Sequence, residues 1–489
     1  MQWHQAPEPR GVPLLRFAQS KPVYQRLRQT LQSNVHTLRQ KGSFAQNFAI
    51  TFSGTAFVAV LGLLVTPLMS RIYAPESYGL FAVFNTIVNN VSLVSTFVYP
   101  SAFILPRLRK RFLALVHLTV GLSVVAFLLL LLVIVLFKNP LLRLLNAEQL
   151  GNWIYLVPVT VFLFNIDVVM GAWYLRTKDF KKRAGVEVGA SVSGRALTLG
   201  WGWLTHGAVG GLIVGDIFSK TTAFFSLLFN GIHHHLGEIF SNISWRRIKA
   251  VAYEYREYPI YVMPTGYLNT LASQLPVLFL TSSFGTAVVG LYAFSSGLLE
   301  LPIGLIGNAV APVFLQKATE THAQDPARLK QLALDLYNKL FYLGLVPFGV
   351  ITVYGDWIFR FVFGARWEQA GLFTSYLGYF YMFKLASYAT GPIYAVLHKQ
   401  RTLLLGTLLL VLARAASLLI GARTHDLNLG MLLFGMSSLV VTFLIDMHVL
   451  RLLHVPVLRI ALRSIVLVAV TVALLQGLRL GLEHLFHLP

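Results

Sequence analysis

The chain has 489 residues, of which 56% are hydrophobic and 12% are charged. A soluble globular protein carries about 25% charged residues, so this composition excludes a soluble enzyme and a disordered chain. The apolar residues form runs of about 20 or more between short charged loops, which is typical of a polytopic α-helical membrane protein and not of a β-barrel, whose segments would alternate. The chain has no cysteine, which excludes disulfides, thiolate catalysis and Cys-ligated metals. We also expect no other metal site and no cofactor.

Residues 1–45 precede the first apolar run and form a basic segment. They contain no apolar stretch of the kind found in signal peptides, so we expect none. Val23, Leu27, Leu31 and Val35 recur every four positions beside several cations. This spacing predicts an amphipathic helix over 22–41 that lies on the cytoplasmic leaflet. A solvated basic tail is the alternative.

The apolar runs that follow predict twelve or thirteen transmembrane helices. The thirteen predicted spans are 46–70, 79–104, 112–137, 152–175, 184–205, 207–230, 259–281, 286–315, 334–355, 368–396, 402–422, 428–450 and 459–484. We group them into an N-terminal six-helix bundle (46–230), a cytoplasmic linker (231–258), a C-terminal six-helix bundle (259–450) and an extra C-terminal helix (451–489).

The cations between these spans indicate the orientation. With the N-terminus in the cytoplasm, the cytoplasmic segments hold 28 Lys and Arg residues and the outer loops hold 7. Because cytoplasmic loops collect Lys and Arg, this asymmetry predicts a cytoplasmic N-terminus and explains most of the net charge of +21. A nucleic-acid partner is therefore not expected. The thirteenth span places the C-terminus outside.

The two halves of the chain resemble each other. Gly79-Leu80-Phe81-Ala82 follows the first span, and Gly290-Leu291-Tyr292-Ala293 follows the seventh, 211 residues later. Gly171 and Tyr174 match Gly391 and Tyr394 at an offset of 220. Six is an even number of spans, so the two six-helix bundles have the same orientation and are related by a pseudo-two-fold axis along the membrane normal.

Two homologous bundles are the architecture of an alternating-access transporter with its site between them. The alternative from the residues alone is a membrane-embedded enzyme, such as a glycosyltransferase or a polymerase. That activity needs clustered acids, histidines or a large soluble loop. The longest internal loop has about 28 residues, and no such cluster is present in the sequence, so we expect a transporter and not an enzyme.

Several stretches resemble the bacterial polysaccharide flippases (Wzx-type) of the multidrug/oligosaccharidyl-lipid/polysaccharide (MOP) exporter superfamily, which includes the MATE transporters. They lie at residues 71–83, 99–106, 258–264, 273–277, 290–293, 301–302, 313–314, 363–364, 367 and 370–371. The resemblance implies the fold of that superfamily. It also implies flipping of a polyprenyl-diphosphate-linked oligosaccharide from the inner to the outer leaflet of the bacterial inner membrane, for O-antigen, capsule or exopolysaccharide synthesis.

Four cations lie deep inside predicted spans, roughly 15–20 Å from the cytoplasmic ends at 1.5 Å per residue. They are Arg195, Lys220, Lys384 and Arg414, and such residues indicate a functional site by default. Arg195 and Arg414 are 219 residues apart, which makes them equivalent positions in the two bundles. A pair of arginines facing a cavity suits a diphosphate, because guanidinium binds phosphate oxygens bidentately. The alternative for each is an ion pair with an acid.

Lys220 has an obvious partner, since Asp216 lies four residues earlier on the same helix face. Lys384 follows a run of aromatic residues that can stack on sugars or pack in the core. Asp167 and Glu300 are also deep. With Asp216, they are candidates for carrying a coupling ion or for balancing the cations.

The expected partners are a polyprenyl-diphosphate-linked glycan, the bilayer, and the polymerase and glycosyltransferases of the same synthesis, with the protein itself a monomer. A MATE-like multidrug exporter is the first alternative function, although a site for organic cations should be acidic. A scaffold for a glycan assembly complex is the second.

Overall fold

The structure of the protein is a computed structural model that describes residues 44–241 and 243–486. The chain consists of a first compact unit, Met1–Thr51, and a second, Phe52–Pro489. The cavities and interactions described below lie within the second unit. The amphipathic helix predicted over 22–41 lies outside the described residues.

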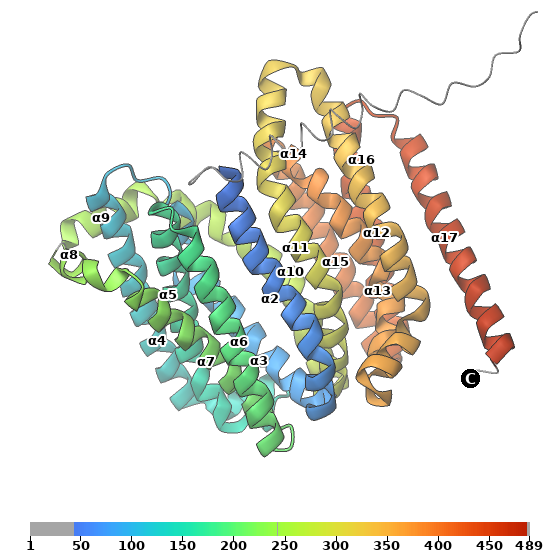
Figure 1. Ribbon diagram of the computed structural model, residues 1–489, viewed down its shortest axis with the longest axis horizontal. Helices are drawn as coiled ribbons and strands as arrows, with labels where there is room; N and C mark the ends of the chain where they lie inside the picture. Colours follow the sequence, from blue (N-terminus) through green and yellow to red (C-terminus); the bar gives the residue numbers. More distant parts are fainter. Residues whose placement is uncertain (1–43, 242, 487–489) are drawn as a thin grey trace, which may run out of the picture. The chain divides into compact units, whose positions relative to one another are not determined.

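A helix is present at each of the thirteen predicted spans (Figure 1). These helices are α2 (Phe44–Ile72), α3 (Pro75–Ser95), α4 (Arg109–Leu144), α5 (Val157–Arg176), α6 (Phe180–Leu204), α7 (Val209–Phe229), α10 (Met263–Phe284), α11 (Thr286–Gln324), α12 (Pro326–Phe363), α13 (Glu368–Ala386), α15 (Gln400–Thr424), α16 (Leu427–Leu452) and α17 (Val457–Phe486). The described chain also contains three shorter α-helices, α8 (Leu236–Ser241), α9 (Trp245–Glu254) and α14 (Gly391–Val396), and several 3-10 or π-helical segments.

Ten spans in the described part of the chain are long and apolar enough to cross a membrane. The other three predicted spans contain α6, α10 and α13, which have 25, 22 and 19 residues. They are long enough for a bilayer but are more polar, and each contributes side chains to the cavities described below. The prediction of an all-helical, multi-pass membrane protein is confirmed.

The structure corrects two predicted boundaries. The second span was expected to continue to residue 104, but α3 ends at Ser95 because Phe97 and Val98 have φ values of +49° and +58°, which a helix does not accommodate. The tenth span was expected to run unbroken to 396. Instead α13 ends at Ala386, and α14 begins just before Pro392, whose missing N–H is tolerated at the start of a helix.

The predicted repeat is visible as a reciprocal contact between α3 and α11. A Cβ placed on Gly79 would lie 1.8 Å from the carbonyl oxygen of Thr286, and a Cβ on Gly290 would lie 1.8 Å from that of Pro75. Both Gly79/Gly290 and Pro75/Thr286 are separated by the 211 residues of the repeat. The two helices therefore cross at equivalent glycines, which is the geometry of a two-fold axis.

A second pair of equivalent residues makes equivalent contacts. The Tyr174 hydroxyl of α5 donates to the carbonyl of Leu227 in α7 at 2.7 Å, and the Tyr394 hydroxyl of α14 donates to that of Ile445 in α16 at 2.9 Å. Each tyrosine thus ties together two helices of its own half. These bonds agree with the predicted offset of 220 between the two tyrosines.

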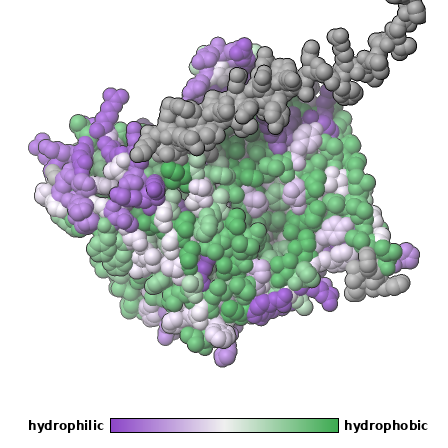
Figure 2. Space-filling view, in the orientation of Figure 1, coloured by the Kyte–Doolittle hydropathy of each residue, from purple (hydrophilic) through white to green (hydrophobic). Residues whose placement is uncertain are grey.

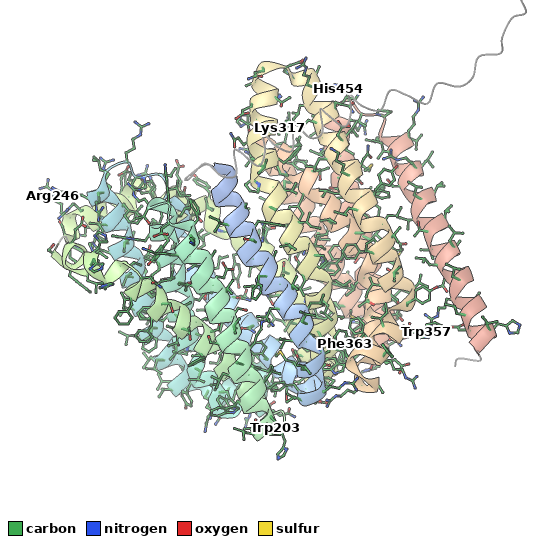
Figure 3. All side chains as sticks on the ribbon, in the orientation of Figure 1. Trp203, Arg246, Lys317, Trp357, Phe363 and His454 are labelled. Atoms are coloured by element: carbon green, nitrogen blue, oxygen red, sulfur yellow. The ribbon has the colours of Figure 1, made fainter. Side chains whose placement is uncertain are left out.

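Polar residues gather at the two ends of the helices. Figure 2 shows apolar residues over the middle of the visible face and hydrophilic residues around α8 and α9. In Figure 3, Arg246, Lys317 and His454, from segments predicted to be cytoplasmic, lie at one end. Trp203, near the predicted outer end of the fifth span, and Phe363, from a predicted outer loop, lie at the other. The alternation of loops between two ends is therefore as predicted.

Candidate functional site: three adjoining cavities

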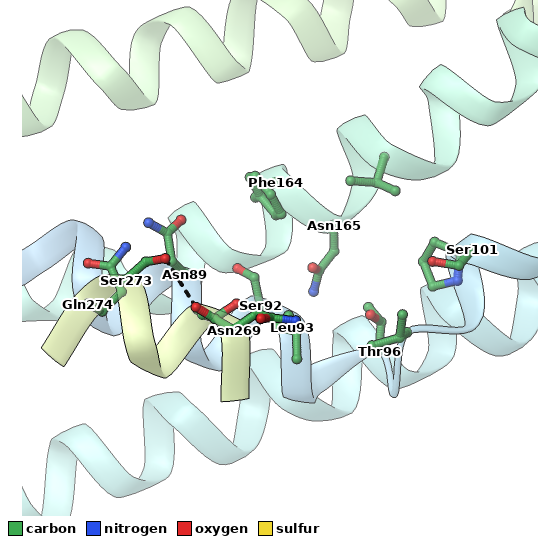
Figure 4. Close-up of a pocket in the computed structure, with 14 residues that line it drawn as sticks. Asn89, Ser92, Leu93, Thr96, Ser101, Phe164, Asn165, Asn269, Ser273 and Gln274 are labelled. Atoms are coloured by element: carbon green, nitrogen blue, oxygen red, sulfur yellow. Dashed lines mark hydrogen bonds between the residues drawn. The ribbon is translucent and has the colours of Figure 1, made fainter. Parts of the chain in front are cut away.

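Three cavities lie between helices of the two halves. The Lys384 cavity, of about 340 Å³, is lined by residues that include Asn85, Asn89, Glu300, Tyr381, Lys384 and Arg414. The Arg195 cavity, of about 360 Å³, is lined by residues that include Gly62, Tyr78, Asn85, Arg195, Phe294 and Leu301. The Asn165 cavity, of about 520 Å³, is lined by residues that include Asn89, Ser92, Asn165, Asn269, Ser273 and Gln274 (Figure 4).

The three cavities share walls and so form one series. Ala82, Asn85, Ala293 and Gly297 line both the Arg195 cavity and the Lys384 cavity. Asn89, Ser273 and Gln274 line both the Lys384 cavity and the Asn165 cavity. The Lys384 cavity is therefore the middle member. Helices α3 and α11 supply the first shared wall, and α3 and α10 supply the second.

Lys384 and Glu300 form an ion pair in the Lys384 cavity. Their Nζ and Oε2 atoms are 2.6 Å apart, and both side chains are more than a third exposed to the cavity. The ammonium group also lies 5.3 Å from the centre of the Tyr381 ring. Glu300 was predicted to balance the deep cations or to carry a coupling ion, and in the structure its ion-pair partner is Lys384, not an arginine. Because the pair is exposed, an incoming anion can compete for Lys384.

Arg414 of α15 is nearly buried, with 7% of its surface exposed. Its Nε atom donates to Ser438 Oγ at 2.9 Å, and Nη1 donates to the carbonyl of Ala272 at 3.0 Å. The guanidinium lies between the rings of Phe380 and Phe434, 5.0 and 5.2 Å from their centres. The packing holds this side chain in one orientation, with its remaining nitrogen, Nη2, unpaired among the described residues.

Arg195 of α6 has no acid within ion-pair distance among the described residues. Its Nε atom donates to Ser191 Oγ at 3.3 Å, and its Nη2 atom lies close to Gly62 of α2, where a Cβ would be 2.9 Å away. Glu187, the acid of the same helix eight residues earlier, forms no ion pair with it. Arg195 and Arg414 therefore line two adjoining cavities and do not face each other across a single one.

The remaining predicted residues line none of these three cavities. Lys220 contacts Asp216 through Nζ and Oδ1, as their four-residue spacing predicts. Asp167 receives two bonds from the Arg183 guanidinium, of 2.7 and 2.8 Å. Arg183 was counted as a loop cation in the sequence, so this partner was missed. Both pairs are ion pairs within the N-terminal half, and the structure gives no sign that they contact a ligand.

Sequence reasoning also missed the amides of the cavities. Asn85, Asn89 and Ser92 recur at intervals of four and three residues along α3, which places them on one helix face. On α10, Asn269 and Ser273 are four residues apart, and Thr270 and Gln274 repeat this spacing one position later. A polar stripe inside an apolar span was the signal that could have identified them, but attention to charged residues passed over it.

Contacts between the end of α2 and the segment before α13 lie at the end of the helices that the charge distribution predicts to be outside. Arg366 donates from Nη2 to the carbonyl of Ser70 at 2.9 Å and also to that of Arg71, and Trp367 Nε1 donates to Ser70 O at 3.0 Å. The Trp367 ring stacks on Phe294 with a centroid separation of 4.0 Å. Phe294 lines the Arg195 cavity, so these contacts lie directly beside it.

Comparison with solved structures shows a shared fold. An inward-facing multidrug resistance MATE family transporter of the MOP superfamily matches with a TM-score of 0.63 at 14% identity, over 83% of this chain and 98% of the other. The lipid II flippase MurJ, in an inward closed conformation, matches with a TM-score of 0.62 at 12% identity, over 89% and 99%. A MOP superfamily transporter from Pyrococcus furiosus, described by a reversed polarity of its binding pocket, matches with a TM-score of 0.53 at 14% identity, over 83% of this chain and 95% of the other.

The chain thus has the fold of the MOP superfamily, a fold of transporters and flippases, and the resemblance noted in the sequence is confirmed. No curated protein matches the sequence. A sequence model with the description "Polysaccharide biosynthesis protein" matches residues 68–371, well over half of the chain. The chain therefore belongs to the polysaccharide biosynthesis protein family.

Proposed function

We propose that the protein is a flippase that moves a polyprenyl-diphosphate-linked oligosaccharide from the cytoplasmic to the outer leaflet of the bacterial inner membrane. The observation that carries this proposal is the charge of the cavities. Arg195, Lys384 and Arg414 line two adjoining cavities that contain one acid among their described residues, Glu300. An excess of cations at membrane depth is costly unless an anionic ligand uses it. The family and the MOP fold support the same assignment.

In this mechanism the diphosphate enters the Lys384 cavity and takes Lys384 from Glu300. Arg414 donates to it from a fixed position, and Arg195 contacts it when the ligand advances into the next cavity. The polyprenyl tail stays in lipid, and rocking of the two halves opens the outer side. With an inside-negative potential, outward movement of an anion is favoured by about 2.3 kcal/mol per charge per 100 mV.

The alternative function, export of organic cations, is less well supported. A cation site needs acidic groups, and Glu300 is already neutralised by Lys384 at 2.6 Å. The two functions separate in cells depleted of the protein. A flippase leaves a polyprenyl-diphosphate oligosaccharide that accumulates in lipid extracts, measured by mass spectrometry, together with loss of the surface polymer. Sensitivity to cationic drugs without accumulation would instead support the exporter.

The site itself is tested by charge-neutral replacement. Arg195→Gln combined with Lys384→Gln removes two charged donors, each worth about 1.5–3 kcal/mol to an anion, so export should fall at least tenfold at normal protein levels. Arg479→Gln is the control, because Arg479 is also a cation of a predicted span (459–484) but pairs with Asp356 and Glu483 away from the cavities. Full export by the double variant would refute the site.

A further inference from the structure

The Asn165 cavity differs from its two neighbours in charge. None of the described residues that line it is charged, whereas the Lys384 cavity holds two cations and an acid. Four carboxamides, Asn89, Asn165, Asn269 and Gln274, come from α3, α5 and α10 and surround it with several hydroxyl groups. Figure 4 shows the Asn165 side chain extending from α5 toward α3.

Much of the hydrogen-bonding capacity of this lining is unused by the protein. Asn165 is 2% exposed, and its Nδ2 atom donates to Ser95 Oγ at 2.9 Å, but no described residue donates to its oxygen. Ser92 is 3% exposed, and its hydroxyl has no partner among the described residues. Gln274 accepts a bond from Thr86 at 2.8 Å and keeps its amide hydrogens. Buried polar groups are normally paired, so these open positions point to a polar ligand.

The chemistry of the lining selects the kind of ligand. A carboxamide offers both donors and acceptors, and so does each hydroxyl of a sugar. Phe164, which is 39% exposed and also lines the cavity, presents a ring to the apolar face of a sugar. A carboxylate placed here would lose its hydration without meeting a cation, which is unfavourable. The lining therefore suits an uncharged saccharide.

The shared wall fixes how such a ligand would lie. Asn89, Ser273 and Gln274 line both this cavity and the Lys384 cavity. A diphosphate at Lys384 therefore places whatever is attached to it directly beside the carboxamides. The two cavities match the two chemically different parts of one molecule, an anionic link and a neutral glycan.

We propose that the Asn165 cavity is a saccharide subsite selective for uncharged sugars, so that the sugar next to the diphosphate in the natural substrate is neutral. This inference rests on the proposed function, because the diphosphate places the sugar. It adds a specificity element made of Asn89, Asn165, Asn269 and Gln274, none of which carries charge.

The test is binding of three lipids to the purified full-length protein in detergent, measured by native mass spectrometry. The lipids are a polyprenyl diphosphate without sugar, the same lipid with one N-acetylglucosamine, and the same lipid with one glucuronic acid. We expect the neutral sugar to improve binding about tenfold, as two or so added hydrogen bonds would, and the acidic sugar to give no improvement.

Variants assign this gain to the cavity. Asn89→Leu and Asn269→Leu alter side chains that are exposed in the cavity, so both should fold, and each should lose most of the gain while binding the sugar-free lipid as the wild type does. Asn230→Leu, at the exposed end of α7, is the control and should keep the gain. Asn165 is buried, so Asn165→Leu can be interpreted only if its melting temperature is that of the wild type. The test therefore relies on Asn89→Leu and Asn269→Leu.

The outcomes separate this inference from the proposed function. Equal binding of all three lipids, or a gain for glucuronic acid as large as that for the neutral sugar, would overturn the subsite while leaving the diphosphate site intact. A gain that survives in both Asn89→Leu and Asn269→Leu would also overturn it. Failure of the wild type to bind any of the three lipids would refute the proposed function and the subsite together.

Discussion

The crossing of α3 and α11 makes a sharp prediction about conformation. Gly79→Ala would place a methyl group 1.8 Å from the carbonyl oxygen of Thr286. Distances below 3.0 Å from a Cβ to another heavy atom essentially do not occur, so the two helices must separate by at least 1.2 Å, the difference between these distances. Overpacking of this kind costs about 1–3 kcal/mol. The cost falls on the state in which the N-terminal ends of α3 and α11 touch, which the loop charges predict to be their outer ends.

A cost of about 1–3 kcal/mol corresponds to about a 5- to 150-fold shift between two states. The protein lacks cysteine, so a single Ala82→Cys reporter, in the wall shared by the Arg195 and Lys384 cavities, can be labelled without background. We expect Gly79→Ala to increase the labelling rate with a membrane-impermeant maleimide added outside the cell. Gly290→Ala should have the same effect, because its Cβ meets Pro75 O at the same 1.8 Å.

Gly121→Ala is the matched control, since a Cβ on this glycine of α4 meets nothing within 4 Å. It should leave the labelling rate unchanged. If Gly79→Ala and Gly290→Ala are both produced normally and both label at the wild-type rate, the crossing does not hold the outer side closed. The reasoning from the glycine positions would then be wrong.

Three further predictions concern charged residues away from the cavities. Asp167→Asn and Arg183→Gln each break the bidentate ion pair between these two residues, so each should lower the melting temperature. The double variant should recover most of this loss, because it leaves neither charge without a partner. Additive losses would show that the two residues are not energetically coupled. The Arg109 guanidinium holds the pKa of Glu238 below its usual range, so the stabilisation from this contact is present at neutral pH and is lost as the pH falls through the folded-state pKa. The rate of amide hydrogen exchange in α8, divided by the intrinsic rate at the same pH, should therefore rise in acid. Glu238→Gln should show this raised ratio already at neutral pH. A ratio that changes in neither case would argue against this role. Asp446 is 1% exposed and accepts from the hydroxyl groups of Ser387 and Thr390. Asp446→Leu removes both bonds, each worth about 0.5–1.5 kcal/mol, and leaves each hydroxyl only the backbone carbonyl that it also contacts. Asp446→Leu should therefore melt below Asp446→Asn, and equal melting temperatures would count against this account.

The positions of the membrane helices could be predicted because each needs a long apolar run, and length and hydropathy are properties of a single segment. The breaks inside two of the runs could not. Phe97 and Val98 are apolar and give no turn signal, yet both adopt positive φ values. Hydropathy describes how apolar a segment is and not its backbone conformation, so it could not locate this break.

Ion pairs within one helix were predictable, and pairs between helices were not. Lys220 and Asp216 are four residues apart, and the structure joins them. Lys384 and Glu300 are 84 residues apart, so only the fold shows that they meet. The equivalence of Arg195 and Arg414 followed from the repeat. Their different surroundings could not be predicted, because they depend on other helices. Arg414 donates to Ser438 of α16 and to a carbonyl of α10, whereas Arg195 donates to Ser191 of its own helix.

The reciprocal glycine contact has a consequence for how this architecture is built. Gly79 contacts the backbone of α11 next to Gly290, and Gly290 contacts the backbone of α3 next to Gly79. This reciprocal arrangement is the isologous pattern of a symmetric homodimer. A single polypeptide here carries the interface that two copies of a six-helix unit would form with each other. Side chains elsewhere in the halves have become different, as Arg195 and Arg414 have. At the glycine crossing the two helices touch through their backbones. No side chain there can become different in the two halves, so this contact keeps the symmetry of the repeat.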